Sequence, residues 1–502
     1  MGKKKSVVLL TLITIVIVAL CAMIAVPSFD LPFPVNGAES TWHPVVDTYD
    51  FDEDLGGGYY TYYYPEGVIS EAEYKTECES REGDADRLEE YTSSYTAHGG
   101  IYLSTDPDDG VVEEDGNGGY TVTESFRTSF EAAAKEIADR YAKKGYSSYR
   151  VSVVDDYAIR VSVPEYDTSA GTTFQYFSYT GGFTLNDGTS DVFEEGRNVS
   201  ASDYFRDFTP ESTRDGVYVR IRLTDEGRTL IRDITTTLSS SSDDSSSSSG
   251  TLYFRVGGED IISLSVTSVI DGDEMYIGGG DSSYTYETAQ TVAILLESAV
   301  QAGDMGISFT ADDARIAPPA YGENTRTLLY IALAIVLLAA LVLPFVFFRG
   351  FGGACLYSTL SYFIITTLCF AFITSGVLEF TLGSVLIFLF GLLVTLFFNG
   401  SVYRAIKAEF MTGKTVDSSV KGGYKKSLAG TLDTYAVLIL AALALLIGAA
   451  GLHALAIQAL ICLVTGAFCN LLWTRFISCM LLSASKDKYK YFGFVREDDD
   501  DE

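Results

Sequence analysis

One uncharged stretch limits most strongly what this chain can fold into. No charged side chain occurs from Leu382 to Phe398, and basic side chains then follow at Arg404, Lys407 and Lys414. An α-helix needs about 20 apolar residues to cross the roughly 30 Å of hydrocarbon in a bilayer, and Lys and Arg gather on the cytoplasmic side of membrane helices. The stretch therefore predicts a membrane span that ends in a basic cytoplasmic loop.

Five further uncharged runs predict five more spans. They cover about residues 6–26, 328–348, 356–373, 435–450 and 452–472. When the N-terminus is placed inside, every basic loop lies on the cytoplasmic side. We expect the first run, within residues 1–26, to be an uncleaved helix rather than a signal peptide. The pattern predicts a multi-pass protein of the cell (cytoplasmic) membrane, with both termini and the tail 483–502 in the cytoplasm.

The segment between the first two spans has a different composition. Residues 27–326 hold 20 Lys and Arg but 56 Asp and Glu, in a chain whose net charge is −32. Such an acidic surface excludes binding of the nucleic-acid backbone, which needs a basic one, and anionic lipid repels it. Only Cys78 of the seven cysteines lies there, so we expect no internal disulfide. We expect residues 27–326 to form a large extracytoplasmic domain, followed by a five-span bundle at 327–482 with a basic cytoplasmic loop at 403–431.

Periodicity within the acidic segment predicts an α+β fold. Apolar residues recur at helical spacing at about 123–145, 230–238 and 287–301, and strand patterns occur at about 149–154, 157–163, 217–223, 252–256 and 261–269. Two βαβ-like halves fit a ferredoxin-like base with an insertion between them. The serine-rich segment 239–250 cannot bury enough apolar surface to order itself, so we expect a flexible loop there.

The chain offers little for catalysis, metal binding or cofactor binding. Its three histidines, His43, His98 and His453, are dispersed along the sequence, which argues against a metal site or a catalytic triad. The sequence MTGKT at 411–415 lacks the earlier glycine of a phosphate loop. The sequence DPDDG at 106–110 misses the alternate oxygen ligands of a calcium loop. We expect no enzyme activity, no cofactor and no metal.

Polar residues inside a membrane are costly and usually functional. This chain has few of them. The candidates are Asn399 near the inner end of the fourth span, Asp433 at the entry of the fifth, Asn470 within the sixth and Arg475 at its exit. Asp433 either pairs laterally with Arg475 or reaches water from its helix end. Alanine and glycine are frequent in the fifth and sixth spans, which predicts a tightly packed bundle.

Several short motifs, taken in order, resemble a known family. They are DLGGG at 54–58, KKGYSSYRVSVVDDYAIRVSVPE at 143–165, LTDEGR at 223–228, QAGDMGISF at 301–309, YGENT at 321–325, TLD at 431–433 and WTR at 473–475. Together with one span, a large outward domain and five further spans, they resemble SecD. This subunit of the bacterial protein-export machinery is related to resistance-nodulation-division transporters. The resemblance covers most of the chain.

The resemblance implies an accessory role in late-stage protein export. It implies a SecF-like membrane subunit that completes a twelve-span assembly, a place beside the Sec translocon channel in membrane lipid, and an outward domain that grips unfolded secretory polypeptide while proton flow drives its motion. Aromatic side chains and strand edges bind extended chains. Our candidates for polypeptide contact are therefore Tyr59, Tyr60, Tyr62, Tyr63, Tyr64 and Tyr284. The alternative for each is an ordinary tyrosine at the rim of a sheet.

The membrane motifs of the family are only partly kept. Its D-x-N in the fourth span corresponds to Phe397, Phe398 and Asn399, so Asn399 matches while Phe397 replaces the carboxylate linked to proton passage. Its D-x-N-x-T-T in the fifth span survives only as Asp433. This departure predicts that the chain by itself does not conduct protons. Two alternatives to an export subunit stay open: a small-molecule or lipid exporter of the same superfamily, and a non-conducting extracytoplasmic binding scaffold.

Overall fold

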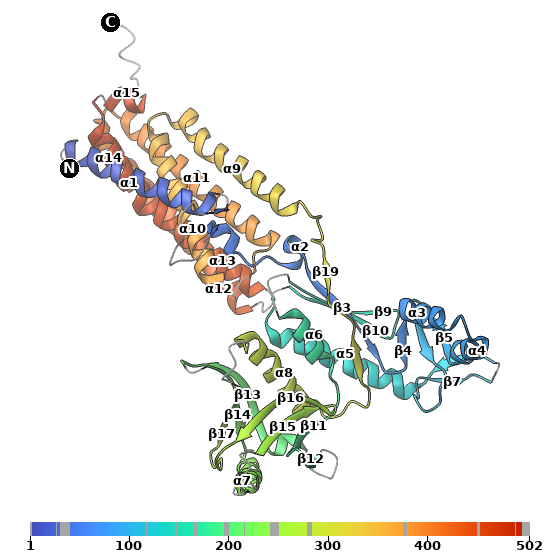
Figure 1. Cartoon of the computed structure of the whole chain (residues 1–502). Helices are drawn as coiled ribbons and strands as arrows, with labels where there is room; N and C mark the ends of the chain where they lie inside the picture. Colours follow the sequence, from blue (N-terminus) through green and yellow to red (C-terminus); the bar gives the residue numbers. More distant parts are fainter. Residues whose placement is uncertain are drawn as a thin grey trace. The chain divides into compact units, whose positions relative to one another are not determined.

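The computed structural model divides into two compact units. The helical unit comprises residues 1–56 and 318–502, and the α+β unit comprises residues 57–317 (Figure 1). The structure describes residues 3–26, 28–30, 41–116, 118–146, 148–164, 169–194, 200–214, 216–240, 250–278, 284–374, 379–448, 452–486 and 488–493. The expected serine-rich loop, apart from its two ends, and half of the expected tail 483–502 lie outside these residues.

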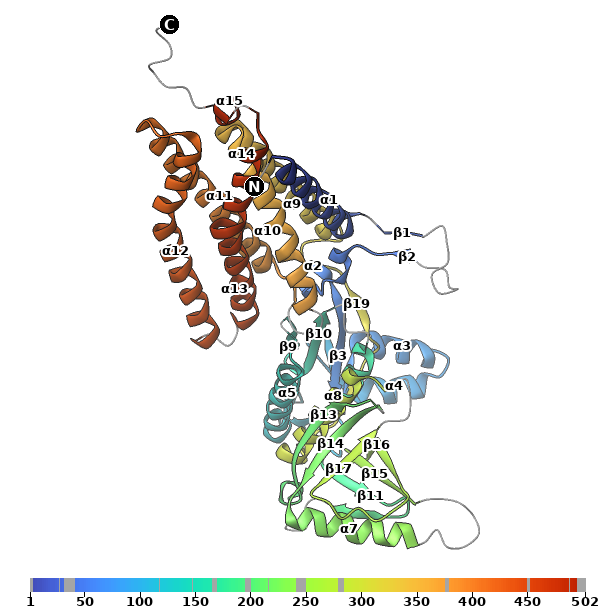
Figure 2. The same ribbon diagram turned by 90° about the vertical axis from the view of Figure 1, so that its left-hand side faces the viewer.

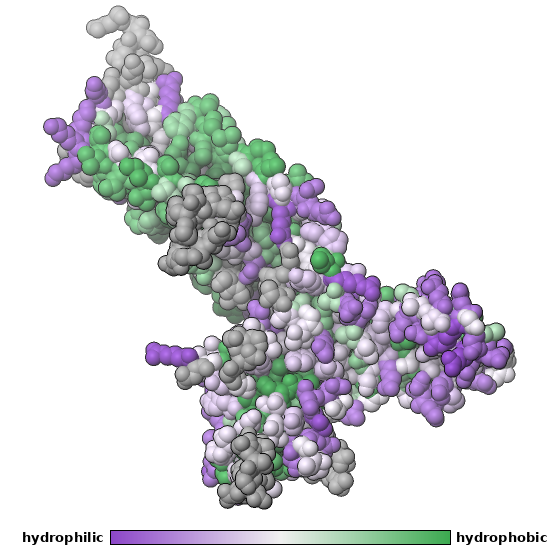
Figure 3. Space-filling view, in the orientation of Figure 1, coloured by the Kyte–Doolittle hydropathy of each residue, from purple (hydrophilic) through white to green (hydrophobic). Residues whose placement is uncertain are grey.

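Six helices of the helical unit are long and apolar enough to cross a membrane. They are α1 (Lys3–Ala25), α9 (Thr325–Phe348), α10 (Phe351–Thr374), α11 (Leu382–Met411), α12 (Val416–Gly448) and the continuous run of α13 (His453–Phe468), a π-helical turn (Cys469–Trp473) and α14 (Thr474–Ala484). Green, apolar side chains cover much of the visible surface of this unit in Figure 3, and purple, hydrophilic ones lie at its upper end. The prediction of six spans in a polytopic α-helical membrane protein is thus confirmed.

Small residues let these helices approach closely. A Cβ atom at Gly391 of α11 would lie 2.1 Å from the hydroxyl of Tyr362 on α10, and one at Gly423 of α12 would lie 2.7 Å from the backbone nitrogen of Ile406 on α11. Without a hydrophobic drive between helices in lipid, such close backbone contacts are what holds a bundle together. The bundle therefore depends on glycine at these crossings.

The first sheet of the α+β unit has the ferredoxin-like order. Its strands are β3 (Gly58–Pro65), β9 (Arg150–Val154), β10 (Ala158–Pro164), β18 (Phe309–Ala311) and β19 (Arg315–Ala317), and all pairs are antiparallel. The order across the sheet is β18, β3, β10, β9, with β19 also paired to β3. Helix α5 (Glu124–Lys144) follows β3, and α8 (Tyr286–Ala302) precedes β18. This βαββαβ order confirms the predicted ferredoxin-like base.

Two insertions extend this base. The first, between β3 and α5, holds β4 (Val68–Ser70), α3 (Glu71–Arg81), α4 (Ala85–Ser93), β5 (Tyr95–His98), β6 (Ile101–Ser104), β7 (Val112–Glu114) and β8 (Tyr120–Val122). The second, between β10 and α8, begins with α6 (Ala170–Ser178) and continues with β11 (Phe183–Asn186), β12 (Asp191–Glu194), β13 (Phe205–Ser212), β14 (Val217–Leu223), α7 (Asp225–Ser240), β15 (Gly250–Val256), β16 (Glu259–Val266) and β17 (Glu274–Gly278). Figure 2 shows the strands of the second insertion beside α7.

Helix α8 is buried along most of its length because it packs against two hydrophobic cores. Its Leu295 and Leu296 pack with the strands of the second insertion, and Ile294 packs with the ferredoxin-like sheet. A helix that is apolar all round belongs in the interior of a protein. Helix α8 therefore holds the second insertion against the ferredoxin-like base by packing on both.

A buried arginine connects three helices of the α+β unit. The Nε of Arg140 on α5 donates to the hydroxyl of Ser298 on α8 at 2.7 Å, and its Nη1 donates to the carbonyl oxygens of Phe177 and Tyr179 at 3.0 and 2.6 Å. Burial lowers the pKa of Arg140 to about 10, and nearby Glu136 opposes that shift. The guanidinium therefore fixes the end of α6 against α5 and α8.

Replacing this arginine tests its structural role. Arg140→Met keeps much of the side-chain volume but leaves two buried carbonyl oxygens without a donor, so we expect a loss of about 3 kcal/mol in local stability. Native-state hydrogen exchange of α6 amides in the purified full chain measures this. The control is Arg127→Met on the same helix, whose exposed side chain pairs with Glu124 and should change stability by less than about 1 kcal/mol. Equal exchange in both variants would contradict the assignment.

Candidate functional site

Strand β3 sorts the predicted tyrosines into two sets. Successive side chains of a strand point to opposite faces of the sheet. Tyr63 is 0% exposed; its hydroxyl donates to the carbonyl oxygen of Phe174 at 2.8 Å and lies 2.6 Å from the hydroxyl of Tyr141. Tyr59 lies half-buried on the same core. We therefore remove Tyr63 from the predicted contact surface, because the alternation of the strand turns its ring into the core.

The other set forms a half-exposed row that we call the tyrosine row: Tyr60, Tyr62 and Tyr64. Neighbouring ring centroids lie 6.0 and 6.1 Å apart, and the guanidinium of Arg160 lies 4.8 Å from the centroid of the Tyr60 ring. Aromatic rings of this kind offer a large apolar surface with a polar tip. Tyr64 of the row also packs against the core that holds Tyr63, and all three rings of the row are half-exposed.

Strand β3 is an interior strand of its sheet. It pairs with β10 on one side and with β18 and β19 on the other. A strand whose two edges are both paired cannot accept a further strand. Strand β3 therefore offers no free edge for the expected edge pairing, although its side chains remain candidates for aromatic contact.

Tyr284 also belongs to a core rather than to an open surface. It packs against the buried side chains of the second insertion, and a Cβ at Gly278 would lie 2.8 Å from its ring. Burial raises the pKa of its hydroxyl well above its usual range. In the described part of the chain this hydroxyl has no hydrogen-bond partner. Tyr284 lies between β17 and α8 and packs on the rim of this core, which favours a structural role over polypeptide contact.

The two predicted membrane asparagines are buried in the helical unit. The Nδ2 of Asn470 donates to the hydroxyl of Tyr435 on α12 at 2.6 Å. A Cβ at Gly466 would lie within 3.1 Å of both that hydroxyl and the hydroxyl of Thr395 on α11. Asn399 is buried on the same helix as Thr395. We call Thr395, Asn399, Tyr435 and Asn470 the polar membrane residues.

Two features of the polar membrane residues are typical of sites that hold water. Among the described residues, neither the Nδ2 of Asn399 nor the Oδ1 of Asn470 has a hydrogen-bond partner, and buried polar groups of this kind commonly bind ordered water. Asn470 also lies in the π-helical turn, and such turns occur frequently at functional sites. None of these four residues carries a carboxylate, so they can line a hydrated path but cannot relay a proton by carboxylate titration.

The remaining predicted membrane residues lie on the outside of the bundle. The Phe397 side chain is 67% exposed and its ring lies 5.4 Å from that of Phe398. Asp433 and Arg475 are both exposed, and these two described side chains form no ion pair within 4 Å of each other. The structure therefore gives no support to a lateral pair, and it places Asp433 within α12 rather than at a helix end. Phe397, which stands where the resemblance implies a carboxylate, is therefore on the surface of the helical unit.

An acidic pair near the loop between α10 and α11 is absent from the sequence predictions. Asp52 is 6% exposed; its Oδ1 accepts from the backbone N–H of Leu55 at 3.0 Å. Phe51 and Phe380 form a parallel bridge, which brings the buried Glu379 near Asp52. Burial raises the pKa of Asp52 to about 6, with smaller contributions from Asp54, Glu379 and Glu53. In the sequence Asp52 lies between Phe51 and Glu53, which gives no signal that its carboxyl is buried.

The architecture defines the class of protein to which the chain can be compared. The fold defines a polytopic membrane protein with one span before, and five spans after, a ferredoxin-like α+β unit. Within the described ranges, no group of three or more His, Cys, Asp and Glu residues could hold a metal ion. No protein family model matches the chain.

A curated relative and solved structures are similar to the chain. The protein translocase subunit SecD of Borreliella burgdorferi is 25% identical over 221 residues, which are 44% of this chain and 36% of that protein. SecDF in its super-membrane-facing form has a TM-score of 0.55 and 14% identity, over 95% of this chain and 57% of that chain. SecDF of Thermus thermophilus has a TM-score of 0.41 and 15% identity, over 97% of this chain and 60% of that chain.

These comparisons confirm the resemblance to SecD-type proteins. The chain has the SecDF fold and is similar to SecD in part of its sequence, from which it diverges widely. It spans about a third of the curated relative that it matches. The chain is accordingly a multi-pass membrane protein with a SecDF-like architecture.

Proton conduction by the isolated chain is the first property to measure. Because the polar membrane residues carry no carboxylate, proteoliposomes that contain only this chain should leak protons no faster than empty vesicles when a pH-sensitive dye is followed. Asp433→Asn should leave that rate unchanged. A sustained leak that Asp433→Asn abolishes would contradict the prediction that the isolated chain does not conduct protons.

Asp52 should make stability depend on pH. A carboxyl with a folded-state pKa of about 6 and an unfolded value of about 4 binds its proton more readily in the folded state. Its protonated form therefore favours folding below about pH 4, and this contribution is lost as the pH rises to 6. Between pH 4 and 7, the melting temperature of the purified chain should fall less with rising pH in Asp52→Asn than in the wild type. The exposed control Asp108→Asn should retain the wild-type profile; an identical profile in all three proteins would contradict the prediction.

Proposed function

We propose that this chain is an accessory subunit of the bacterial Sec protein-export machinery that assists late-stage polypeptide translocation across the cytoplasmic membrane. The observation that carries this proposal is the SecDF fold over 95% of the chain, together with sequence similarity to a protein translocase subunit. The acidic α+β unit supports a role outside the membrane on polypeptide, and the proposal includes no enzymatic step.

The proposed orientation places the α+β unit outside the cell membrane. Basic side chains concentrate where α11 ends and α12 begins, including Lys414 and Lys426, which lie beside Glu409. Positive charge near span ends favours the cytoplasmic side. With this loop inside, the number of spans places both α1's N-terminus and the end of α14 inside, and the residues between α1 and α9 outside.

The proposed assembly includes a SecF-like membrane subunit and the Sec translocon channel. This chain covers 57% of the SecDF chain that it matches, so a second membrane subunit would supply the rest of that architecture. Phe397 and Val437 expose apolar side chains on α11 and α12, which suits a partner helix or lipid. The proton-motive force then acts through the partner, while Asn399 and Asn470 contribute polar lining.

A non-conducting extracytoplasmic scaffold is the second candidate function. Phe397 stands where the resemblance implies a proton-linked carboxylate, and the polar membrane residues offer no replacement. In this alternative the chain holds polypeptide outside the membrane without energy coupling. Proton-dependent export in the complete assembly would separate the first candidate from this one.

The partner proposal can be tested by native mass spectrometry of a gentle detergent extract. We expect a SecF-like subunit to be recovered with the full chain, because the exposed apolar faces of α11 and α12 need covering. A chain with Phe397→Asp should recover less partner, since burying an unpaired carboxylate is costly. Recovery of the wild-type chain without any SecF-like or channel subunit would count against an export role.

Contact with polypeptide can be tested at the tyrosine row. A photo-crosslinking residue in place of Tyr62 should trap a stalled secretory chain, because its ring is accessible beside Tyr60 and Tyr64. The control is the same residue at Tyr276, an exposed tyrosine of β17 on another sheet. Crosslinks at position 62 to lipid alone, or equal crosslinking at both positions, would contradict contact at the row.

A further inference from the structure

The ferredoxin-like sheet ends in a strand whose outer edge is open. Among the described strands, β18 pairs only with β3. The carbonyl oxygen of Ser308 accepts from the N–H of Glu66, and the N–H of Asp312 donates to the carbonyl oxygen of Tyr62, both at 2.9 Å. In an antiparallel strand the direction of these groups alternates from residue to residue. The backbone groups of Phe309 and Ala311 therefore point away from β3.

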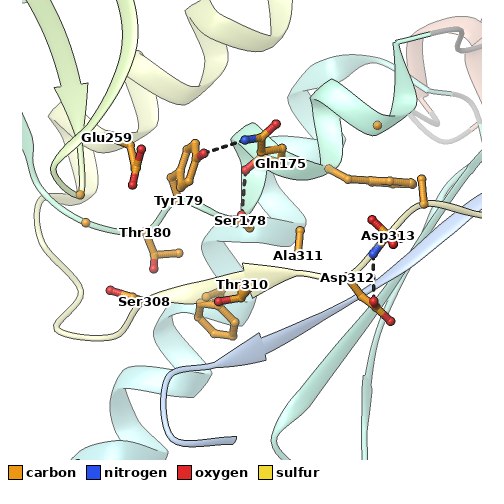
Figure 4. Close-up of a pocket in the computed structure, with 16 residues that line it drawn as sticks. Gln175, Ser178, Tyr179, Thr180, Glu259, Ser308, Thr310, Ala311, Asp312 and Asp313 are labelled. Atoms are coloured by element: carbon orange, nitrogen blue, oxygen red, sulfur yellow. Dashed lines mark hydrogen bonds between the residues drawn. The ribbon is translucent and has the colours of Figure 1, made fainter. Parts of the chain in front are cut away.

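A groove lies along this open edge. Residues 308–314 form one wall, and helix α6 with Tyr179 forms the other, around a cavity of about 610 Å³ (Figure 4). Figure 4 shows Gln175, Ser178 and Tyr179 across the groove from Thr310 and Ala311. A Cβ atom at Gly171 of α6 would meet nothing within 4 Å. The groove thus has room beside the unpaired backbone groups and has the size of ordinary ligand sites.

The end of the groove is closed by tight backbone contacts. A Cβ atom at Gly181 would lie 2.2 Å from the Cα of Gly257, and the N–H of Gly257 donates to the carbonyl oxygen of Gly182 at 3.1 Å. The hydroxyl of Thr180 donates to the carbonyl oxygen of Ile307 just before β18. The accessible edge therefore begins at Phe309.

The rim of the groove is acidic. Asp312 accepts a hydrogen bond from Arg315 at 2.7 Å, whereas the described residues Asp313 and Glu259 form no ion pair. The surrounding unit is itself strongly acidic. Charge complementarity therefore favours an occupant with basic side chains at its ends over an acidic one.

We propose that an extended, basic segment of unfolded polypeptide adds as a strand to the free edge of β18, inside the groove between β18 and α6. This proposal rests on the export function proposed above and relocates edge pairing from β3 to β18. Phe309 and Ala311 supply at most four backbone hydrogen bonds, which gives weak and sequence-tolerant binding. Lys or Arg of the segment lies near Asp313 and Glu259. Such binding suits a chain that must be held and then released.

The opposite edge of the sheet is a less suitable site. Strand β9 also pairs on only one side, but its Val153 is exposed to solvent and the groove residues all belong to other segments. An added strand at β9 would lack a second wall. The geometry therefore singles out β18 among the two edges of this sheet.

A binding assay with the full chain in nanodiscs tests the groove. The probe is a fluorescent peptide of ten alternating Val and Ser residues with two Lys at each end, followed by polarisation. Gly171→Leu fills the groove and improves helix propensity, and Ala311→Pro removes an edge N–H in a position where an edge strand tolerates proline. We expect each to weaken binding at least tenfold, while Gly171→Ala changes it less than threefold.

Two peptide controls distinguish strand addition from general charge attraction. Methylation of alternate backbone nitrogens should abolish binding, and replacing the Lys residues by Glu should weaken it at least tenfold. The Asp313→Asn, Glu259→Gln double variant should reduce that Lys preference. Unchanged binding in Gly171→Leu and Ala311→Pro, or equal binding of the methylated peptide, would overturn the proposal. Self-association of the chain that these variants abolish would show that a second copy occupies the groove, and would overturn it too.

Crosslinking separates failure of this proposal from failure of the export function. A photo-crosslinking residue at Thr310 should trap a stalled secretory chain, and Gly171→Leu should remove that crosslink. Crosslinks from Tyr62 but not from position 310 would overturn the groove and leave the export function standing. Absence of crosslinks from both positions would count against both proposals.

Discussion

The pairing of β3 with its two neighbours is the interaction on which the α+β unit depends. Six register pairs join β3 to β10, and β18 and β19 occupy its other edge. These contacts bring together segments that lie far apart in the sequence, with both insertions looped out between them. The same pairing buries Tyr63, exposes the tyrosine row, and leaves β18 at the edge beside α6. The pairing of β3 thus determines both the core of the α+β unit and the positions of the residues proposed to contact polypeptide.

Much of this fold could be predicted because its strongest signals are local. The absence of charge over about 20 residues is sufficient to mark a span, and alternation in residues 157–163 marks β10. A ferredoxin-like base was also predicted, but the strand patterns at 217–223, 252–256 and 261–269 that suggested its second half lie in the second insertion instead. The interior position of β3 could not be predicted, because its partner β18 lies about 250 residues further along the chain. A tyrosine-rich strand looks the same in sequence whether its edges are free or paired.

In the candidate site, too, local features could be predicted from the sequence, whereas contacts between distant segments could not. The sequence identified Asn399 and Asn470 as buried polar groups, and the structure adds the bond from Asn470 to Tyr435. That contact joins two helices whose rotation the sequence does not specify. Asp52 escaped prediction because its burial arises from the bridge between Phe51 and Phe380. Its neighbours in sequence, Glu53 and Asp54, resemble an ordinary solvated turn.

The membrane bundle and the α+β unit point to a division of labour in export. The polar membrane residues can hold water but contain no titrating carboxylate, whereas the α+β unit offers an aromatic row, an open strand edge and acidic charge. In this account the chain handles polypeptide, and a partner couples the assembly to proton flow. The SecDF fold is kept while the membrane chemistry that the resemblance implies has changed.

Reconstituted translocation tests this account most directly. Proteoliposomes with the Sec channel, the SecF-like partner and a secretory protein stalled late in transit would be compared with and without this chain, under an imposed proton gradient. The account predicts that release of the stalled protein into the vesicle lumen speeds up only when the chain and its partner are both present. An unchanged release rate on adding the chain to its partner would contradict the account.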